Sequence, residues 1–241
     1  MFKKPMAVRA DGIRFGGMVD AVSGFTNRHA RRIALLANDG VTFGIGQLQP
    51  ISSVVSDMTR KSYAHHVKDE LVGIVAFVIV TWGVFLTSVV MPINKFGLIP
   101  RDASGLIGII TMPLLHGSLS HLINNTISLC VLLALLAGSR TRSWEIVSAV
   151  VVGGGALLWL FGRSAIHIGA SGLIFGLIAF LIVSGIFERR TIPMIVSLIT
   201  GILYGSTLLF GVLPTASGIS WDGHLCGAAA GVAVAYLSTR K

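Results

Sequence analysis

Six long apolar stretches without a single Asp, Glu, Lys or Arg limit what this 241-residue chain can fold into. These stretches are residues 71–93, 103–139, 146–162, 164–187, 191–221 and 223–239. A helix needs about 20 mostly apolar residues to cross a bilayer. Charged residues make up only 12% of the chain, against about 25% in soluble proteins. This composition predicts a polytopic membrane protein and excludes soluble, disordered, collagen-like and coiled-coil classes. Two cysteines exclude a disulfide scaffold and a four-ligand zinc site.

The fold class expected from these stretches is an all-α bundle of six transmembrane helices. Residues 103–139 are too few for two spans and a turn, so we expect Leu106–Leu115 to lie in the membrane interface or dip into it before the span begins. The stretch 191–221 ends in the loop signals Gly211, Pro214, Ser217 and Gly218, so its span is expected to end near residue 211. The expected helices lie near 71–91, 118–138, 145–161, 169–187, 191–211 and 222–238.

The distribution of Lys and Arg predicts cytoplasmic N- and C-termini, because positive residues concentrate on the inner side of a membrane. The first 70 residues carry ten of the 19 Lys and Arg. Anionic lipid is a simpler partner for this basic region than nucleic acid, and no nucleic-acid partner is expected. Residues 1–68 lack a signal-peptide pattern and are interpreted as a poorly defined cytoplasmic extension, with short strands possible in Val41–Val55 and an amphipathic helix in Arg28–Ala37. Residues 69–241 form the expected membrane domain.

Three of the expected spans begin with polar residues, which are costly inside a membrane. They begin at Ser118–Asn125, Gly169–Gly176 and Asp222–Gly231. Each segment alone has an ordinary explanation. A membrane serine bonds to its own helix, glycines four apart form packing faces, and a histidine can be a core hydrogen-bonder or part of a proton path.

Depth in the membrane changes this interpretation. All three helices run from outside to inside in the expected topology, so Ser171, His224, His121 and Asn125 lie within roughly 12 Å of the outer boundary. His121 and Asn125 are four residues apart and share one helix face. Glycines allow the helices near 169–187 and 222–238 to approach closely. One layer therefore holds a nucleophile, a base and a pair of hydrogen-bond donors, the parts needed for acyl transfer.

These motifs resemble those of the rhomboid family of intramembrane serine proteases, and the resemblance covers about residues 70–240. The matching segments are His116-Gly-Ser-Leu-Ser-His121-Leu-Ile-Asn-Asn125, Gly169-Ala-Ser171-Gly172, and His224-Leu-Cys-Gly227-Ala-Ala-Ala-Gly231. Gly97-Leu-Ile-Pro-Arg101 also looks like a bacterial version of the family's first loop.

The resemblance implies a role for each matching residue. Ser171 would be the nucleophile and His224 its general base. The His121 and Asn125 side chains, with the backbone N–H of Ser171, would form the oxyanion hole. Supporting roles in close packing and loop structure would fall to Gly169, Gly172, Gly227, Gly231 and His116.

The family uses a Ser–His dyad without a carboxylate, so Asp222 is interpreted as a helix N-cap rather than a triad member. Phe175 stands where the family often has Tyr; it can stack on an imidazole but cannot donate a hydrogen bond. Asn124 beside Asn125 leaves the register ambiguous by one residue, although the spacing favours Asn125. His167, in the loop before the serine, could touch substrate but is interpreted as a plain loop histidine.

The resemblance also implies the substrate, a transmembrane protein segment that unwinds easily and has a small residue before the cut. Substrate would enter beside the helix at 191–211 and the loop Phe210–Trp221, near a shallow wet cavity. No metal or cofactor is implied, and the expected location is the plasma membrane of a bacterium. Two alternatives are a catalytically inactive relative that binds membrane proteins and a transporter with a histidine proton path.

Overall fold

The computed structural model describes residues 51–214 and 219–239, with side chains from residue 68 onward. The described elements are helical, and residues Asp57–Lys241 form one compact unit. The long helices are α2 (Ile51–Val90), α4 (Leu119–Ser139), α5 (Ser143–Phe161), α6 (Ser171–Glu188), α7 (Thr191–Gly211) and α8 (Trp221–Thr239). The short ones are η2 (Ile93–Phe96), η3 (Ala103–Ile107), α3 (Gly108–Thr111) and η4 (Met112–Leu114).

Five of the described helices are long and apolar enough to cross a membrane, so the chain is a multi-pass membrane protein. The five segments are Lys68–Val90, Leu119–Ser139, Ser143–Phe161, Ser171–Glu188 and Thr191–Gly211. The helix expected as the sixth span is α8, which has 19 residues but is not among these five. Asp222, His224 and several glycines reduce its hydropathy below that of the other five.

The predicted helix positions agree closely with the structure for the five C-terminal helices, whose ends lie within two residues of the expected ranges. Residues Ala103–Leu114 form short helical turns, consistent with a non-spanning segment.

The prediction of a poorly defined extension up to residue 68 was wrong for its last part, because α2 already begins at Ile51. Residues 51–72 contain neither Gly nor Pro, so the helix continues past the charges that mark the apolar boundary. Strands in residues 51–55 are excluded by the same helix, while Arg28–Ala37 lies outside the described residues. The helix ends at Val90, two residues before Pro92, which disfavours helical geometry in the residue preceding it.

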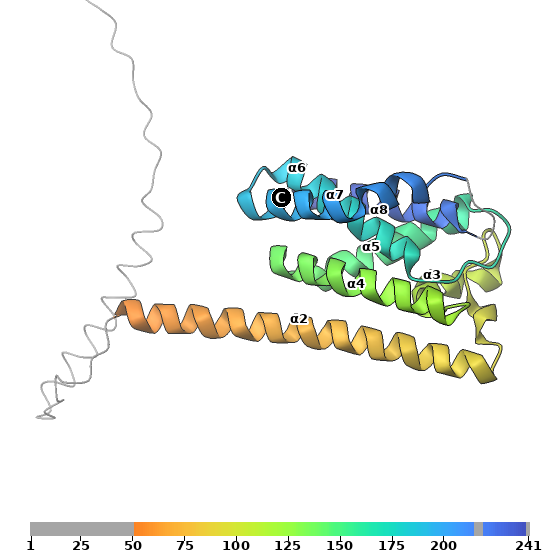
Figure 1. The fold of residues 1–241 in the computed structure, drawn as a ribbon, viewed down its shortest axis with the longest axis horizontal. Coiled ribbons are helices and arrows are strands. Elements are labelled where there is room, and N and C mark those ends of the chain that lie inside the picture. The colour runs from red at the N-terminus through yellow and green to blue at the C-terminus, as the bar shows by residue number, and fades with distance from the viewer. Residues whose placement is uncertain (1–50, 215–218, 240–241) are drawn as a thin grey trace, which may run out of the picture. The chain divides into compact units, whose positions relative to one another are not determined.

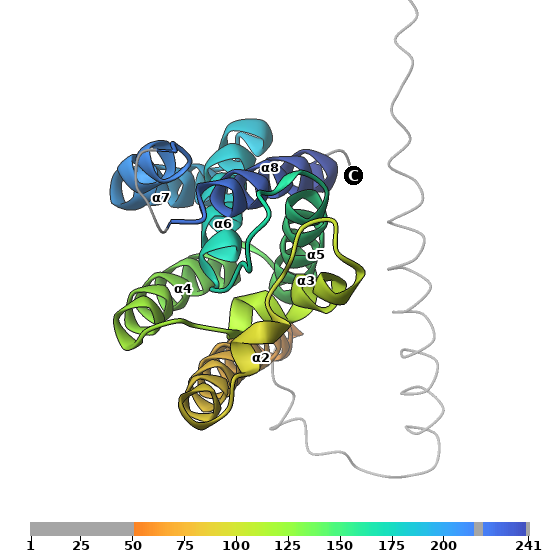
Figure 2. The same ribbon diagram turned by 90° about the vertical axis from the view of Figure 1, so that its right-hand side faces the viewer.

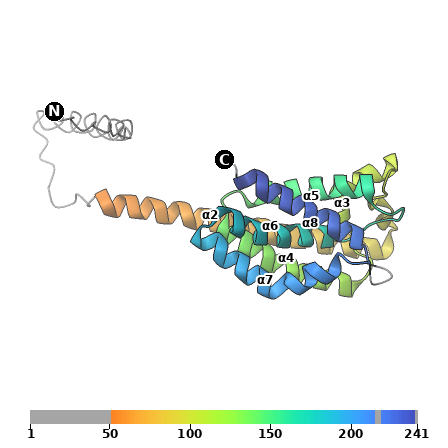
Figure 3. The ribbon, with the colours of Figure 1, turned by 90° about the horizontal axis from the view of Figure 1, so that it is seen from above.

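The centre of the bundle is α6, which packs against α4, α5, α7 and α8, as the view along the helices shows (Figure 2). Residues 172–181 of α6 are all buried. In the view from above, α7 and α5 lie on opposite sides with α6 between them (Figure 3). This arrangement places the first residue of α6, Ser171, next to the starts of two other helices.

The helices α4, α6 and α8 begin at the same end of the bundle (Figure 1). Glycines fix the pairing of α6 with α8. A Cβ atom at Gly227 would overlap the carbonyl oxygen of Gly172, and one at Gly231 would overlap that of Gly176. Both contacts advance in the same direction along the two helices, so α6 and α8 run parallel at the backbone separation that only glycine permits.

The loop before α6, residues 162–170, is held by the segment that precedes α4. His167 and Leu98 form an antiparallel bridge, with N···O distances of 2.8 and 3.0 Å. The Gly169 N–H donates to the carbonyl of Met112 at 2.9 Å. The guanidinium of Arg101 donates to the carbonyls of Leu160 and Gly162 at 3.3 and 2.7 Å. This positive charge caps the C-terminal end of α5. These bonds fix the approach of the chain to Ser171.

Candidate active site

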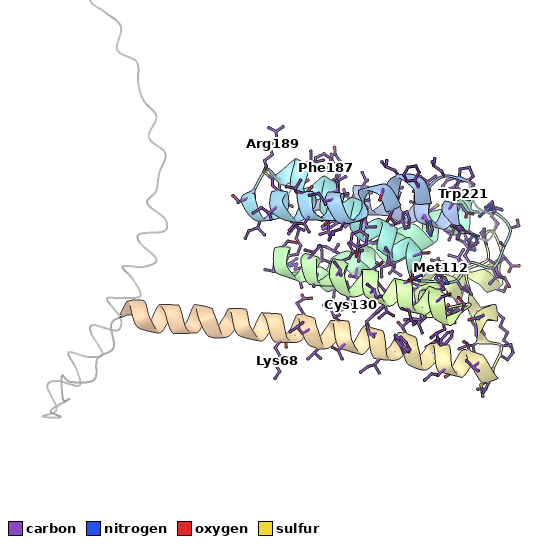
Figure 4. The ribbon with its side chains drawn as sticks, in the orientation of Figure 1. Lys68, Met112, Cys130, Phe187, Arg189 and Trp221 are labelled. Carbon is purple, nitrogen blue, oxygen red and sulfur yellow. The ribbon has the colours of Figure 1, made fainter. Side chains whose placement is uncertain are left out.

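The polar residues predicted to act together lie at one end of the bundle, where α4, α6 and α8 begin. Met112 and Trp221 lie at this end, whereas Phe187 and Arg189 lie at the opposite end (Figure 4). Ser171 is the first residue of α6 and His224 the fourth of α8. His121 and Asn125 are in the first two turns of α4. The structure therefore brings all four residues to one layer.

The imidazole of His224 is held by two neighbours. Its Nδ1 lies 2.8 Å from the backbone carbonyl oxygen of Gly211, the last residue of α7. A carbonyl only accepts, so Nδ1 carries the proton and Nε2 of the neutral ring keeps a lone pair. The ring of Phe175 stacks on the imidazole with centroids 4.0 Å apart and planes 5° apart. His224 is buried, with 8% of its surface exposed. The arrangement gives the tautomer that a general base requires.

Ser171 is half-buried, and its neighbour Gly172 lies against the first turn of α8. A Cβ atom at Gly172 would lie 3.3 Å from the carbonyl oxygen of Gly223. His224 directly follows Gly223 in the chain, and Ser171 directly precedes Gly172. In the described part of the chain, no hydrogen bond joins Ser171 to His224. Catalytic hydrogen bonds are often long in the absence of substrate and tighten when it binds.

Asn125, rather than Asn124, faces the interior. Asn125 is 6% exposed and its amide nitrogen lies 2.9 Å from Nε2 of His116, whereas Asn124 is exposed. The imidazoles of His116 and His121 meet edge to face at 5.0 Å. His116 is therefore more than a loop support, because it fixes the orientation of the Asn125 amide and leaves its second N–H available.

Gly169 connects this donor pair to the serine loop. Its φ of +115° is a conformation that residues with a side chain rarely adopt. A Cβ atom there would lie 2.6 Å from Cε1 of His121 and 3.6 Å from Nδ2 of Asn125. The backbone two residues before Ser171 thus lies directly against the two side chains predicted to bind an oxyanion.

The interpretation of Asp222 as an N-cap was wrong. Asp222 lies inside the first turn of α8 and is 5% exposed. Its carboxylate accepts two hydrogen bonds from Arg163, one from the backbone N–H at 2.8 Å and one from the guanidinium at 3.0 Å. His167 was also misjudged as a plain loop histidine. It is 3% exposed, with Nδ1 2.7 Å from Ser220 Oγ and Nε2 3.0 Å from the carbonyl oxygen of Arg163.

His116 and Arg163, which both lie outside the spanning helices, have shifted pKa values. Burial lowers the pKa of His116 to about 4, and the nearby His121 adds to this effect. The hydrogen bond to Asp222 raises the pKa of the Arg163 guanidinium. His116 is therefore neutral near pH 7, so its Nε2 can accept the Asn125 N–H.

Sequence reasoning missed Gly211, Arg163 and Ser220. Gly211 was treated only as a loop signal, because a backbone carbonyl leaves no trace in a residue pattern. Arg163 had a weak signal, since it is the single charge between residues 146 and 187. Across residues 68–214 and 219–239 there is no cluster of three or more His, Cys, Asp or Glu side chains arranged to hold a metal ion.

A helical bundle with five segments able to cross a membrane, and with Ser, His and Asn gathered where three parallel helices begin, is a polytopic membrane protein with a polar layer at one end of the bundle. Residues 103–241 match the rhomboid domain, and the chain belongs to the rhomboid family.

Similar proteins come from mycobacteria. An uncharacterized protein of Mycobacterium tuberculosis H37Rv and another of Mycobacterium bovis are each 44% identical over 151 residues, covering 58% of this chain and 62% of each relative. An uncharacterized protein of Mycobacterium leprae is 45% identical over 141 residues, covering 54% of this chain and 55% of that protein. The matches thus span less than two thirds of the relatives' length.

Proposed function

We propose that this chain is an intramembrane serine endopeptidase that cleaves transmembrane segments near the outer membrane face with a Ser171–His224 dyad. The observation that carries the proposal is the 2.8 Å contact between His224 Nδ1 and the Gly211 carbonyl oxygen. A backbone carbonyl here does what a carboxylate does in a catalytic triad, because it holds the imidazole in one orientation and one tautomer. Nε2 is then the atom available to take a proton from serine.

The proposed reaction follows from these positions. Ser171 Oγ attacks the peptide carbonyl while Nε2 of His224 takes its proton. The developing oxyanion accepts hydrogen bonds from the Asn125 amide, the His121 imidazole and the Ser171 backbone N–H. The protonated His224 then gives its proton to the leaving amine. His224 then takes a proton from water, which attacks the acyl-serine ester; the bond to Ser171 Oγ breaks, His224 returns the proton to this oxygen, and the second product leaves. Phe175 keeps the imidazole plane fixed throughout.

The setting of the reaction is proposed from the pattern of charges and spans. Six spans with cytoplasmic termini place the polar layer near the outer face, and the location is the plasma membrane of a bacterium. Substrates are transmembrane proteins whose helices unwind easily, since a helical segment hides its carbonyls in backbone hydrogen bonds. Anionic lipids bind the basic inner surface.

The test uses the full chain purified into liposomes, with a fluorophosphonate probe and a single-span substrate containing a helix-breaking segment. We expect the wild type to label and cleave. Ser171→Ala and His224→Ala should do neither. Asn125→Ala should reduce kcat by about 10²–10³-fold with a small change in KM, as expected for one oxyanion donor. Ser139→Ala, at the opposite end of α4, is the matched control and should retain full activity.

A well-folded wild type that neither labels nor cleaves would refute the proposal and favour the inactive relative, for which the next experiment is capture of bound membrane proteins. Proton-coupled uptake by the liposomes would instead favour a transporter.

A further inference from the structure

A polar cluster around two buried side chains, His167 and Asp222, lies outside the acyl-transfer machinery and joins two segments of it. We call this cluster the Asp222 brace; its members are Arg163, His167, Ser220 and Asp222. Arg163 and His167 belong to the loop that leads into α6, and Ser220 and Asp222 to the start of α8. The brace therefore spans the two chain segments from which Ser171 and His224 project.

The contacts of the brace are numerous and short. Arg163 holds both carboxylate oxygens of Asp222, one through its backbone N at 2.8 Å and one through its guanidinium at 3.0 Å. Ser220 Oγ lies 3.3 Å from Oδ1 of Asp222 and 2.7 Å from Nδ1 of His167. The guanidinium also lies 5.2 Å from the ring centre of Trp221. Two buried side chains, His167 and Asp222, thus have partners on all their polar atoms.

The brace reaches the reacting groups through short stretches of backbone. His167 lies four positions before Ser171, and the intervening Gly169 donates its N–H to the Met112 carbonyl and packs on His121. Asp222 lies two positions before His224, in the same helical turn. At that spacing the carboxylate points about 200° away from the imidazole around the helix, so it acts on His224 through the backbone of α8.

We propose that the Asp222 brace is a positioning device that sets the distance between Ser171 and His224. The proposal rests on the proposed function, because positioning is measured by the rate of acyl transfer. The α6–α8 glycine contacts fix how closely the helices pack, but glycine faces can slide along each other. The brace restricts this sliding, because it links the loop before Ser171 to the first turn of α8. Small misplacements of reacting groups are costly, since about 1 Å can reduce a rate 10²-fold.

The test compares Asp222→Asn with the wild type in the full chain in liposomes. Asparagine keeps the shape but removes the charge and one acceptor. The measurements are the fluorophosphonate labelling rate, the labelled fraction at end point, and kcat and KM for a single-span substrate. Because the labelled fraction counts folded sites, each rate is divided by it. Glu145→Gln is the matched control, since it removes a carboxylate from an exposed ion pair with Arg142.

We expect Asp222→Asn to lower the labelling rate and kcat about tenfold, with KM within about twofold of the wild type. The control should change none of these values. A destabilised Asp222→Asn variant with unchanged kcat per labelled site would overturn the proposal, because the brace would then support only the fold.

Ser220→Ala decides the question when Asp222→Asn yields no labelled protein. It removes only the bridging hydroxyl, and an expected threefold decrease in kcat would support the brace, whereas an unchanged kcat would overturn it. A folded wild type that neither labels nor cleaves refutes the proposed function itself, and the positioning role with it.

Discussion

Replacing Gly169 by alanine tests whether the loop before Ser171 and the donor pair on α4 form one unit. The new Cβ atom would lie 2.6 Å from Cε1 and 2.7 Å from Nε2 of His121, closer than such atoms can approach. The φ of +115° adds backbone strain for any residue with a side chain. Either the loop or the imidazole of His121 must move.

The size of the effect follows from these two terms. Strain at such a backbone position costs about 1–3 kcal/mol, so the free energy of unfolding should decrease by that amount. Displacing an oxyanion donor costs about 10²–10³-fold in kcat. We therefore expect Gly169→Ala to fold, with a loss in kcat of about 100-fold and a smaller change in KM.

The assay is cleavage of a single-span substrate in liposomes, with fluorophosphonate labelling to count folded sites. Gly138→Ala is the control, because a Cβ atom at Gly138, near the other end of α4, meets nothing within 4 Å. A folded Gly169→Ala variant with kcat within threefold of the wild type would refute the reasoning, since His121 would then not need its observed position.

Two further predictions concern stability. His116 binds a proton near pH 6.5 in the unfolded chain but only near pH 4 in the folded protein. Its contribution to the free energy of unfolding should therefore be full above pH 6.5 and decrease as the pH falls towards 4. The variant His116→Gln should flatten this part of the profile of unfolding against pH, measured in detergent. The ion pair of Arg140 and Glu188, 2.5 Å apart with side chains 16% and 12% exposed, lies at the far end. Glu188→Ala should lower the free energy of unfolding by about 3 kcal/mol. Glu145→Ala removes one partner of an exposed ion pair and should lower it by at most about 0.5 kcal/mol. Equal losses in the two variants would contradict this prediction.

The helices could be predicted from the sequence because the bilayer imposes one simple rule, an apolar run of sufficient length. The same rule failed for the start of α2. The apolar part of this helix begins at Lys68, but the helix itself begins at Ile51. Charge interrupts a span but does not interrupt a helix. Likewise, α8 packs against α5 and α6 and needs less hydropathy than a helix surrounded by lipid.

Parts of the candidate site were predictable where helical periodicity or small residues carry the information. The pairing of His121 with Asn125 follows from their spacing, and the close approach of α6 and α8 follows from their glycines. The partners of His224 and Asp222 did not follow. Gly211 contributes a main-chain carbonyl, and Arg163 meets Asp222 across 59 residues of sequence. Contacts of this kind depend on how loops fold over the helix ends, which no local pattern records.

The shared direction of α4, α6 and α8 has an electrostatic consequence. Each helix presents the positive end of its peptide dipoles, equivalent to about half an elementary charge, at the end where Ser171 lies. The three contributions add at this end of the bundle. Negative charge that develops there is stabilised by peptide groups, while the carboxylate of Asp222 is already neutralised by Arg163. Because peptide groups do not titrate, this positive potential is independent of pH and no single substitution removes it.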